Sequence, residues 1–502
     1  MRDAHILRRA PARLLAAAAF AALAFGGTAA RADLTADQVW QSWSDYYSSL
    51  GQEITSAASE RQGDTLVVSG VAMTAKMPTG SYSAAFGDVR LRELGDGRVE
   101  ISFAPEVPIT LNNTAESGET VDMGMRMMQT GMSVVASGTP EALSYDVAAP
   151  DVRFGIDKMT VDGAEVPMQA TVAMTGGAGT HKVTSGGARA VSSSFTADAL
   201  SFDVAAKNPE GEGNFTAKGN MAGISGMSDA TMPEGIDMTD MKAALAAGFG
   251  LTSGLTFGSG SYSVDFNDAG KTMTANVEAG GGNLDIALSK AGLVYGGGGK
   301  AAKISVVASD LPFPVDLAYA ETGFNLTMPL SQSDAAQPVA FLVKVIDLTV
   351  SEAIWGMIDA GNQLPHDPAT VILDVSGMAK LMVDLFDPAV AESPAPPGQI
   401  DQVTLNQLLV RLAGAELTGS GAVNVDNSAG MPAPVGAVDL QLTGGNKLLD
   451  TLASMGLIPP DQVMGAKMML GLFAVPTGED VLTSKIEFKE DGGIYANGQR
   501  VQ

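Results

Sequence analysis

The chain has 502 residues and no cysteine, so disulfides cannot stabilise it and its stability has to come from packing. Its formal net charge of −26 at pH 7 excludes a surface suited to nucleic acid, because the phosphate groups would be repelled. Glycine, at 59 residues, and an aromatic content of only 6% indicate many turns and a core of small side chains.

The first 32 residues have the order of parts that is typical of a cleaved secretory signal. Arg8 and Arg9 precede an apolar run at residues 14–25, and Ala30, Arg31 and Ala32 follow as an A-x-A cleavage motif. The run has 12 residues, fewer than the roughly 20 that span a bilayer, which favours a cleaved signal over an anchor. We therefore expect export to the periplasm and cleavage after Ala32. The mature chain would carry a net charge of −30 and no transmembrane segment.

The mature chain is expected to open with a helix. Thr35 and Gln38 have the spacing of a capping box, and apolar residues follow three or four positions apart up to Leu50. After this helix the apolar residues recur at every second position. Val89 leads into a turn at residues 95–97, and Val99 begins the returning strand. Such alternation, with Gly and Asp at the turns, predicts antiparallel strands with one apolar face.

Helical patterns interrupt the strands rather than alternate with them. We expect further short helices at residues 240–249, 352–360, 378–386, 447–455 and 461–473. The predicted fold class is mainly β, with one or more elongated, curved antiparallel sheets. A few short helices are expected at the N-terminus, in the middle and at the C-terminus.

A proline-rich stretch at residues 392–398 is the best boundary between segments. We expect an N-terminal helix with a β-rich half at 33–240, and a second β-rich half with short helices at 241–391. A strand-helix-helix-strand segment is expected at 399–502.

Residues 315–330 alternate on both sides of Glu321, Thr322 and Gly323, which predicts a hairpin with a turn at these three residues. We expect its apolar side chains to share one face that lines an apolar groove. They are Val315, Leu317, Tyr319, Phe324, Leu326 and Met328. The alternative is that this face is ordinary core. Many long alternating strands with few helices to cover them favour the groove.

Candidate reactive groups have simple structural explanations. His366 and Asp367 lie between two prolines in the expected connection from helix 352–360 to the next strand, which favours a turn over a catalytic pair. A methionine cluster at residues 123–132 could bind copper(I), but its spacing also suits one apolar strand face.

No nucleophile motif, phosphate loop or metal-ligand spacing is present in the sequence, so we expect a protein that is not an enzyme and has no cofactor or metal.

Three segments together carry a resemblance to a known family. They are residues 351–374, residues 412–421, and the C-terminal run from 444 to 498. In this order they resemble the alphaproteobacterial exported proteins grouped as domain of unknown function 2125. That resemblance implies a compartment and a fold, but no activity or catalytic residues. More remotely, the long alternating strands resemble AsmA-type envelope proteins, whose curved sheets shelter acyl chains.

Two functions remain open at this point. The first is binding or carrying an apolar envelope ligand such as a lipid. The second is a structural or assembly role with another envelope protein and no small-molecule ligand. A hydrolase is disfavoured because neither a nucleophile nor a base can be named.

Overall fold

The computed structural model describes residues 33–49, 52–115, 117–184, 186–208, 211–390, 393, 396–428 and 431–502. The expected signal and its cleavage site at Ala32 lie outside the described residues. The structure is 64% strand and 12% helix, which confirms the mainly β class. Among the described residues, no helix is long and apolar enough to cross a membrane.

The N-terminal third consists of one helix followed by strands. Its elements are α1 (Ala36–Ser49), β1 (Gln52–Thr55), β2 (Ala58–Gln62), β3 (Thr65–Met77), β4 (Gly80–Glu93), β5 (Val99–Ser102), β6 (Glu106–Thr114), β7 (Thr120–Thr130), β8 (Ser133–Thr139) and β9 (Ala142–Val161).

The middle of the chain contains the longest strands. Its elements are β10 (Ala164–Glu165), β11 (Met168–Thr184), β12 (Ala188–Lys207), β13 (Asn214–Pro233), α2 (Met241–Ala246), β14 (Gly250–Phe257), β15 (Ser259–Asp268), β16 (Lys271–Ala279), β17 (Gly282–Ser289), β18 (Gly292–Ala308), β19 (Val315–Met328), β20 (Gln337–Val350) and α3 (Glu352–Ile358).

The C-terminal part brings two adjacent helices and a short-stranded end. Its elements are β21 (Ala369–Leu381), the 3-10 turn η2 (Pro388–Val390), β22 (Gly398–Leu412), β23 (Ala415–Asp426), β24 (Ala433–Thr443), α4 (Gly445–Ser454), α5 (Pro460–Phe473), β25 (Val475–Gly478), β26 (Val481–Phe488), β27 (Ile494–Ala496) and β28 (Gln499–Arg500).

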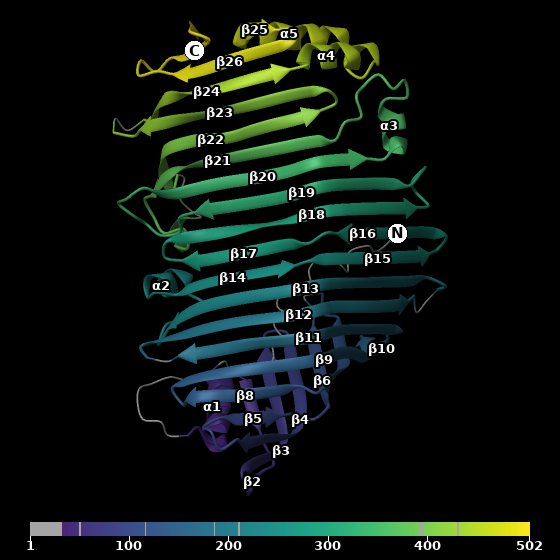
Figure 1. The fold of residues 1–502 in the computed structure, drawn as a ribbon, viewed down its shortest axis with the longest axis vertical. Helices are drawn as coiled ribbons and strands as arrows, with labels where there is room; N and C mark the ends of the chain where they lie inside the picture. The colour runs from purple at the N-terminus through teal and green to yellow at the C-terminus, as the bar shows by residue number, and fades with distance from the viewer. Residues whose placement is uncertain are drawn as a thin grey trace.

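The 28 strands of the described residues belong to one antiparallel sheet in which strands adjacent in sequence are mostly neighbours in space. Figure 1 shows the strands from β9 onward stacked along the long axis of the molecule and lying across it, with α1 near one end and α4 and α5 at the other. Both outermost positions are occupied by short strands. Strands β1 and β2 pair with β3, and β25 and β27 pair with β26. Short edge strands limit unwanted pairing with other chains.

A line of irregular backbone crosses the sheet partway along the strands; we call it the crease. It is marked by positive φ angles at Gly176 (62°), Gly223 (62°), Gly281 (119°), Ala301 (48°) and Asp347 (53°). Here β14 and β15 follow each other along β13, and β16 and β17 follow each other along β18. Such irregular positions break the alternation of side chains between the two faces of a sheet.

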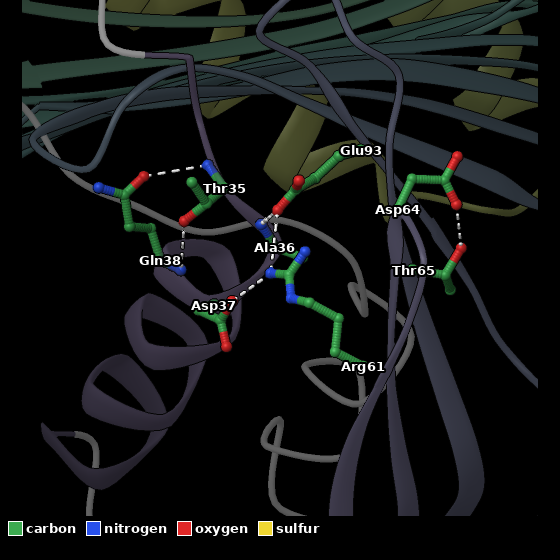
Figure 2. A network of polar contacts seen from close by, with 8 residues as sticks. All are labelled: Thr35, Ala36, Asp37, Gln38, Arg61, Asp64, Thr65 and Glu93. Atoms are coloured by element: carbon green, nitrogen blue, oxygen red, sulfur yellow. Dashed lines mark hydrogen bonds and ion pairs between the residues drawn. The ribbon is translucent and has the colours of Figure 1, made fainter.

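Helix α1 is attached to the sheet at its first turn. The capping box is confirmed: the Thr35 N–H donates to Gln38 Oε1 at 3.0 Å, and the Gln38 N–H donates to Thr35 Oγ1 at 3.3 Å. Glu93 Oε1 accepts the N–H of Ala36 at 2.9 Å and pairs with Arg61 at 3.1 Å (Figure 2). Arg61 and then the Ala36 N–H hold the pKa of Glu93 below its usual value.

The tightly packed core lies at the α1 end of the sheet. Val39 and Trp43 of α1 are buried against Val99, Ile101 and other apolar residues of the sheet. The Trp43 ring stacks on Phe103 with centroids 5.8 Å apart. A second cluster around Val107 and Met127 adjoins the first. The other end of the sheet has far fewer buried side chains.

The expected hairpin at residues 315–330 is wrong, because β19 is one continuous strand. Strands β18 and β20 pair with it on both sides of Glu321, Thr322 and Gly323. Lys344 on β20 binds the Glu321 carboxylate at 2.6 Å. Glu321, Thr322 and Gly323 resemble a turn in sequence but form a strand, because β18 and β20 supply partners for their backbone hydrogen bonds. The pairing of β18 with β19 is interrupted at the crease, between the pairs Lys300–Glu321 and Ala302–Tyr319.

The helix expected at residues 378–386 is also wrong. Strand β21 continues to Leu381 and pairs with both β20 and β22, so pairing on two sides overrides the local helical pattern. The other expected helices are confirmed, with shifted ends, as α2, α3, α4 and α5.

Candidate functional site: an exposed apolar face

One file of directly opposed residues crosses eleven neighbouring strands on one face of the sheet. Because opposed residues of antiparallel strands point to the same side, these residues share a face. We call the file the apolar row; it consists of Phe195, Gly226, Leu255, Leu284, Gly297, Phe324, Val343, Leu373, Leu408, Gly419 and Leu440. At about 4.8 Å per strand spacing, it is roughly 48 Å long.

The large side chains of the apolar row are exposed to solvent from Phe195 to Val343 and partly exposed from Leu373 to Leu440. Phe195 is 46% exposed, Leu284 42% and Phe324 36%, although each is paired with a neighbouring strand on both sides. A file of this length with its apolar side chains uncovered is unusual for a soluble protein, where large apolar patches mark binding surfaces. At the α1 end the same file continues through Gly179 and Val147 to Val134, which is buried in the core.

Glycines in the apolar row let neighbouring side chains lie flat on the sheet. A Cβ atom on Gly226 would collide with the ring of Phe195. On Gly297 it would lie 3.3 Å from both Phe324 Cε1 and Leu284 Cδ1. The row therefore presents a low apolar surface in which three glycines, Gly226, Gly297 and Gly419, interrupt the bulky residues.

A second apolar file lies beside the row over the middle strands. It consists of Ile286, Tyr295, Leu326, Phe341 and Val375. The rings of Tyr295 and Phe324 are 5.1 Å apart, so the two files are in contact. Phe341 is 46% exposed, which shows that this file is also uncovered.

A third apolar file lies across the crease. It consists of Phe202, Gly219, Tyr262, Val277, Ile304, Leu317 and Val350. It shares a face with the apolar row because the crease reverses the alternation of β19. The Tyr319 hydroxyl lies over Gly299, 3.5 Å from where a Cβ atom would be, and Gly299 is paired with Thr322 on the Phe324 side.

All six residues expected to line a groove lie on this apolar face. They are Val315, Leu317, Tyr319, Phe324, Leu326 and Met328, and none of them is buried. Leu326 lies beside Phe324, whereas Leu317 lies beyond the crease, next to Ile304. Most of the face, including Phe195, Leu255 and Val343, was not predicted from the sequence. Its alternation is visible within each strand, but the register between strands is not.

The opposite face of the sheet is more polar and carries the hollows. Three shallow hollows of about 440, 400 and 650 Å³ are lined mainly by residues pointing to this side, such as Asp229, Asp316 and Asp439. Asn325 of β19 belongs to the same polar side, between Phe324 and Leu326 of the apolar face. These three hollows therefore lie mainly on the side of the sheet away from the apolar face.

His366 makes its contacts with the helix before it, rather than with Asp367. Its Nδ1 lies 3.1 Å from Glu352 Oε2, and its Nε2 lies 3.6 Å from Asp359 Oδ2. The imidazole also stacks on Trp355 with centroids 4.2 Å apart. These contacts fold the connection back onto α3.

Asp359 closes the end of α3. Its carboxylate accepts the backbone N–H groups of Gln363 at 2.9 Å and Leu364 at 2.6 Å. Burial alone would raise the pKa of Asp359, but these two N–H groups and His366 outweigh burial and hold the pKa below its usual value. The carboxylate thus satisfies two backbone N–H groups of the connection that follows α3.

The methionine cluster and His181 make contacts that are explained by the packing of the sheet. Met127 is buried and Met125 packs against the same cluster, as expected for an apolar strand face. Among the described residues, no group of three or more His, Asp or Glu side chains could hold a metal ion. His181 Nδ1 lies 2.7 Å from Ser193 Oγ, and burial lowers the pKa of this imidazole to about 4.

Comparison with known proteins gives one family match. Residues 266–501 match the model of the family described as "Uncharacterized protein conserved in bacteria (DUF2125)". No curated protein and no solved structure matches the chain. The matched region runs from β15 to the C-terminal strands and includes the apolar row from Leu284 to Leu440.

Proposed function

The chain belongs to the DUF2125 family through residues 266–501, and on this premise we propose that it binds the hydrocarbon part of lipids on its apolar face. The proposed compartment is the periplasm, supported by the secretory pattern of residues 1–32. The proposed role is binding or carrying rather than catalysis. The family description names no activity, and the physical chemistry of the face supports the proposal.

The exposure of the apolar row carries this proposal. Leu255, Leu284 and Val343 are each more than a third exposed, and neighbours on the same face are similarly open. Covering apolar surface releases about 25 cal/mol per Å², so each large side chain contributes up to about 2 kcal/mol when a ligand covers it. A hydrocarbon chain laid along the row would gain this stabilisation at several consecutive strands.

The length of the row indicates what kind of ligand fits. The hydrocarbon core of a bilayer is about 30 Å thick, so one acyl chain spans about 15 Å. The row, at roughly 48 Å, is about three times longer. The proposed ligand is therefore either several acyl chains bound end to end or one long hydrocarbon.

The test compares substitutions that add a carboxylate to the two faces of β19. Leu326→Asp places a charge on the apolar face, and Asn325→Asp places the same charge on the polar face one residue away. Leu326 is half-exposed, so the new carboxylate keeps its contact with water and the fold should be retained. Leu317→Asp makes the same change beyond the crease.

Native mass spectrometry of full-length protein, purified from its own cells, measures bound lipid, and thermal melting measures folding. We expect wild type and Asn325→Asp to retain lipid, and Leu326→Asp to melt cooperatively but lose it. A wild-type protein free of lipid would contradict the proposal and favour the structural or assembly role. Unfolding of both leucine variants would assign the face to the core.

A further inference from the structure

Helix α5 exposes large apolar side chains on the side that faces away from the protein. Met464 is 66% exposed, Met468 70%, Met469 54% and Leu472 54%. The neighbouring helix α4 exposes Lys447, Asp450 and Ser454 instead, as a surface helix in water normally does. The two helices are consecutive in sequence and pack together, so they share the same end of the molecule.

The outer side of α5 exposes apolar side chains to water, which is unfavourable. Val463 is buried against the protein, and beyond the first turn, which exposes Asp461 and Gln462, the outer side chains are apolar as well. A helix that is apolar all round is normally buried on all sides. Its charged residues are Asp461 in the first turn and Lys467, which pairs with Asp450 of α4 at 2.6 Å. Asp461 is exposed at the start of the methionine side, so the one charge on this side is negative.

The end of α5 meets the end of the apolar row. The carbonyl of Phe473, the last residue of α5, accepts hydrogen bonds from Ser484 Oγ at 2.6 Å and Asn497 Nδ2 at 2.9 Å. Ser484 is directly opposed to Leu440, the last residue of the apolar row. Figure 1 shows α5 beside the last strands of the stack. The exposed helix face and the exposed sheet face thus adjoin at one end of the molecule.

We propose that α5 docks on a lipid bilayer surface, with Met464, Met468, Met469 and Leu472 inserted among the headgroups. The apolar row would then end at the bilayer, so a hydrocarbon chain could pass between the two; this consequence rests on the proposed function. A helix lying in the plane of the interface buries its apolar side about 5–10 Å deep, at the boundary between headgroups and acyl chains. The net charge of −26 and the exposed carboxylate of Asp461 select neutral over anionic headgroups.

The test uses flotation of the full-length protein with phosphatidylcholine vesicles. The variant Met464→Gln, Met468→Gln, Leu472→Gln removes three inserted side chains at exposed positions, where folding should be unaffected. Met227→Gln is the matched control, since Met227 is 61% exposed and lies on β13, away from α5. Melting temperatures of all three proteins are compared.

We expect the vesicle-bound fraction of wild type and the control to be equal, and binding by the triple variant to fall by about tenfold or more. Added phosphatidylglycerol should weaken binding of the wild type. Equal flotation of the triple variant would overturn the proposal, as would wild type that does not float. A wild-type dimer that the triple variant loses would assign the face to a second copy.

Lipid content, measured by native mass spectrometry, separates this inference from the proposed function. If the triple variant keeps its bound lipid but no longer floats, docking at α5 is supported independently of binding on the sheet. If wild type floats but never carries lipid, docking stands and the proposed function fails. A single variant, Met468→Lys, repeats the test with one charge on the helix face.

Discussion

His181 lies on β11 directly opposite Tyr145, beside the buried core at the α1 end of the sheet. Burial lowers the pKa of its imidazole to about 4, whereas an unfolded histidine titrates near 6.5. The unfolded chain therefore binds a proton more readily than the folded one. The stability contributed by the neutral ring is complete above pH 6.5 and is lost as the pH falls toward 4.

Replacing His181 by glutamine should remove this pH dependence. The wild type should lose up to about 3 kcal/mol of unfolding free energy between pH 7 and pH 4 that the variant does not lose. Urea unfolding of both proteins at pH 7, 6, 5 and 4 measures the difference. Parallel changes in the two proteins over this range would show that the folded ring titrates normally.

His366 illustrates how a sequence neighbour can mislead. Asp367 is adjacent in sequence, but Glu352 and Asp359, at the two ends of α3, lie near the two ring nitrogens. The prediction that His366 and Asp367 are dispensable for function remains a prediction. The structural role is clearer: the imidazole and Asp359 hold the connection after α3 in place.

At the scale of the elements, the crease depends on backbone conformations that most residues avoid. Glycine provides them at Gly176, Gly223 and Gly281, where positive φ angles cost little. Ala301 adopts a φ of 48° in β18 although its Cβ makes this conformation unfavourable by about 1 kcal/mol. The crease therefore forms even where the local residue opposes it, because the paired strands on both sides impose it.

Ala301→Gly should relieve this strain and leave the unfolding free energy unchanged or raise it by up to about 1 kcal/mol, since glycine also gains freedom in the unfolded chain. Ala302→Gly, one residue on, is the control. Ala302 is buried and 2% exposed, so this change should lower the unfolding free energy by about 1 kcal/mol. Urea unfolding measures both. Equal losses in the two variants would contradict the strained backbone at Ala301.

At the scale of the whole molecule, the two ends of the sheet differ in what covers the apolar face. At the α1 end, Val39 and Trp43 bury the face, and the structure has an ordinary core. Toward α5 the same face is open, with exposed residues such as Phe195 and Phe341. This difference between the two ends agrees with the proposed binding of hydrocarbon chains along the open part of the sheet.

The proposed compartment makes a direct prediction about the mature protein. Cleavage after Ala32 should leave Asp33 as the first residue, because Ala30 and Ala32 are the small residues that signal peptidase requires. N-terminal sequencing of protein from the periplasmic fraction measures this. A chain that still begins at Met1 and sediments with membranes would contradict export by cleavage.

The sequence by itself determined the features that depend on neighbours along the chain. Thr35 and Gln38 identified the start of α1, the pattern at Val99 and Ile101 identified buried strand positions, and the helices α3, α4 and α5 were placed within a few residues. Capping and periodicity involve residues about one helical turn or a few strand positions apart. Their physical causes are therefore present in a short segment of sequence.

Only the tertiary structure decided which residues form the apolar face. Phe195 and Leu284 belong to one row through the strands between them, so their alignment depends on the register of every intervening pair. The continuity of β19 through Glu321–Gly323, and the side on which Leu317 lies, depend on bonds to β18 and β20. The position of α5 at the end of the row depends on Ser484 reaching Phe473. Each of these features depends on a contact between separate strands or helices, and the sequence of one segment alone does not specify that contact.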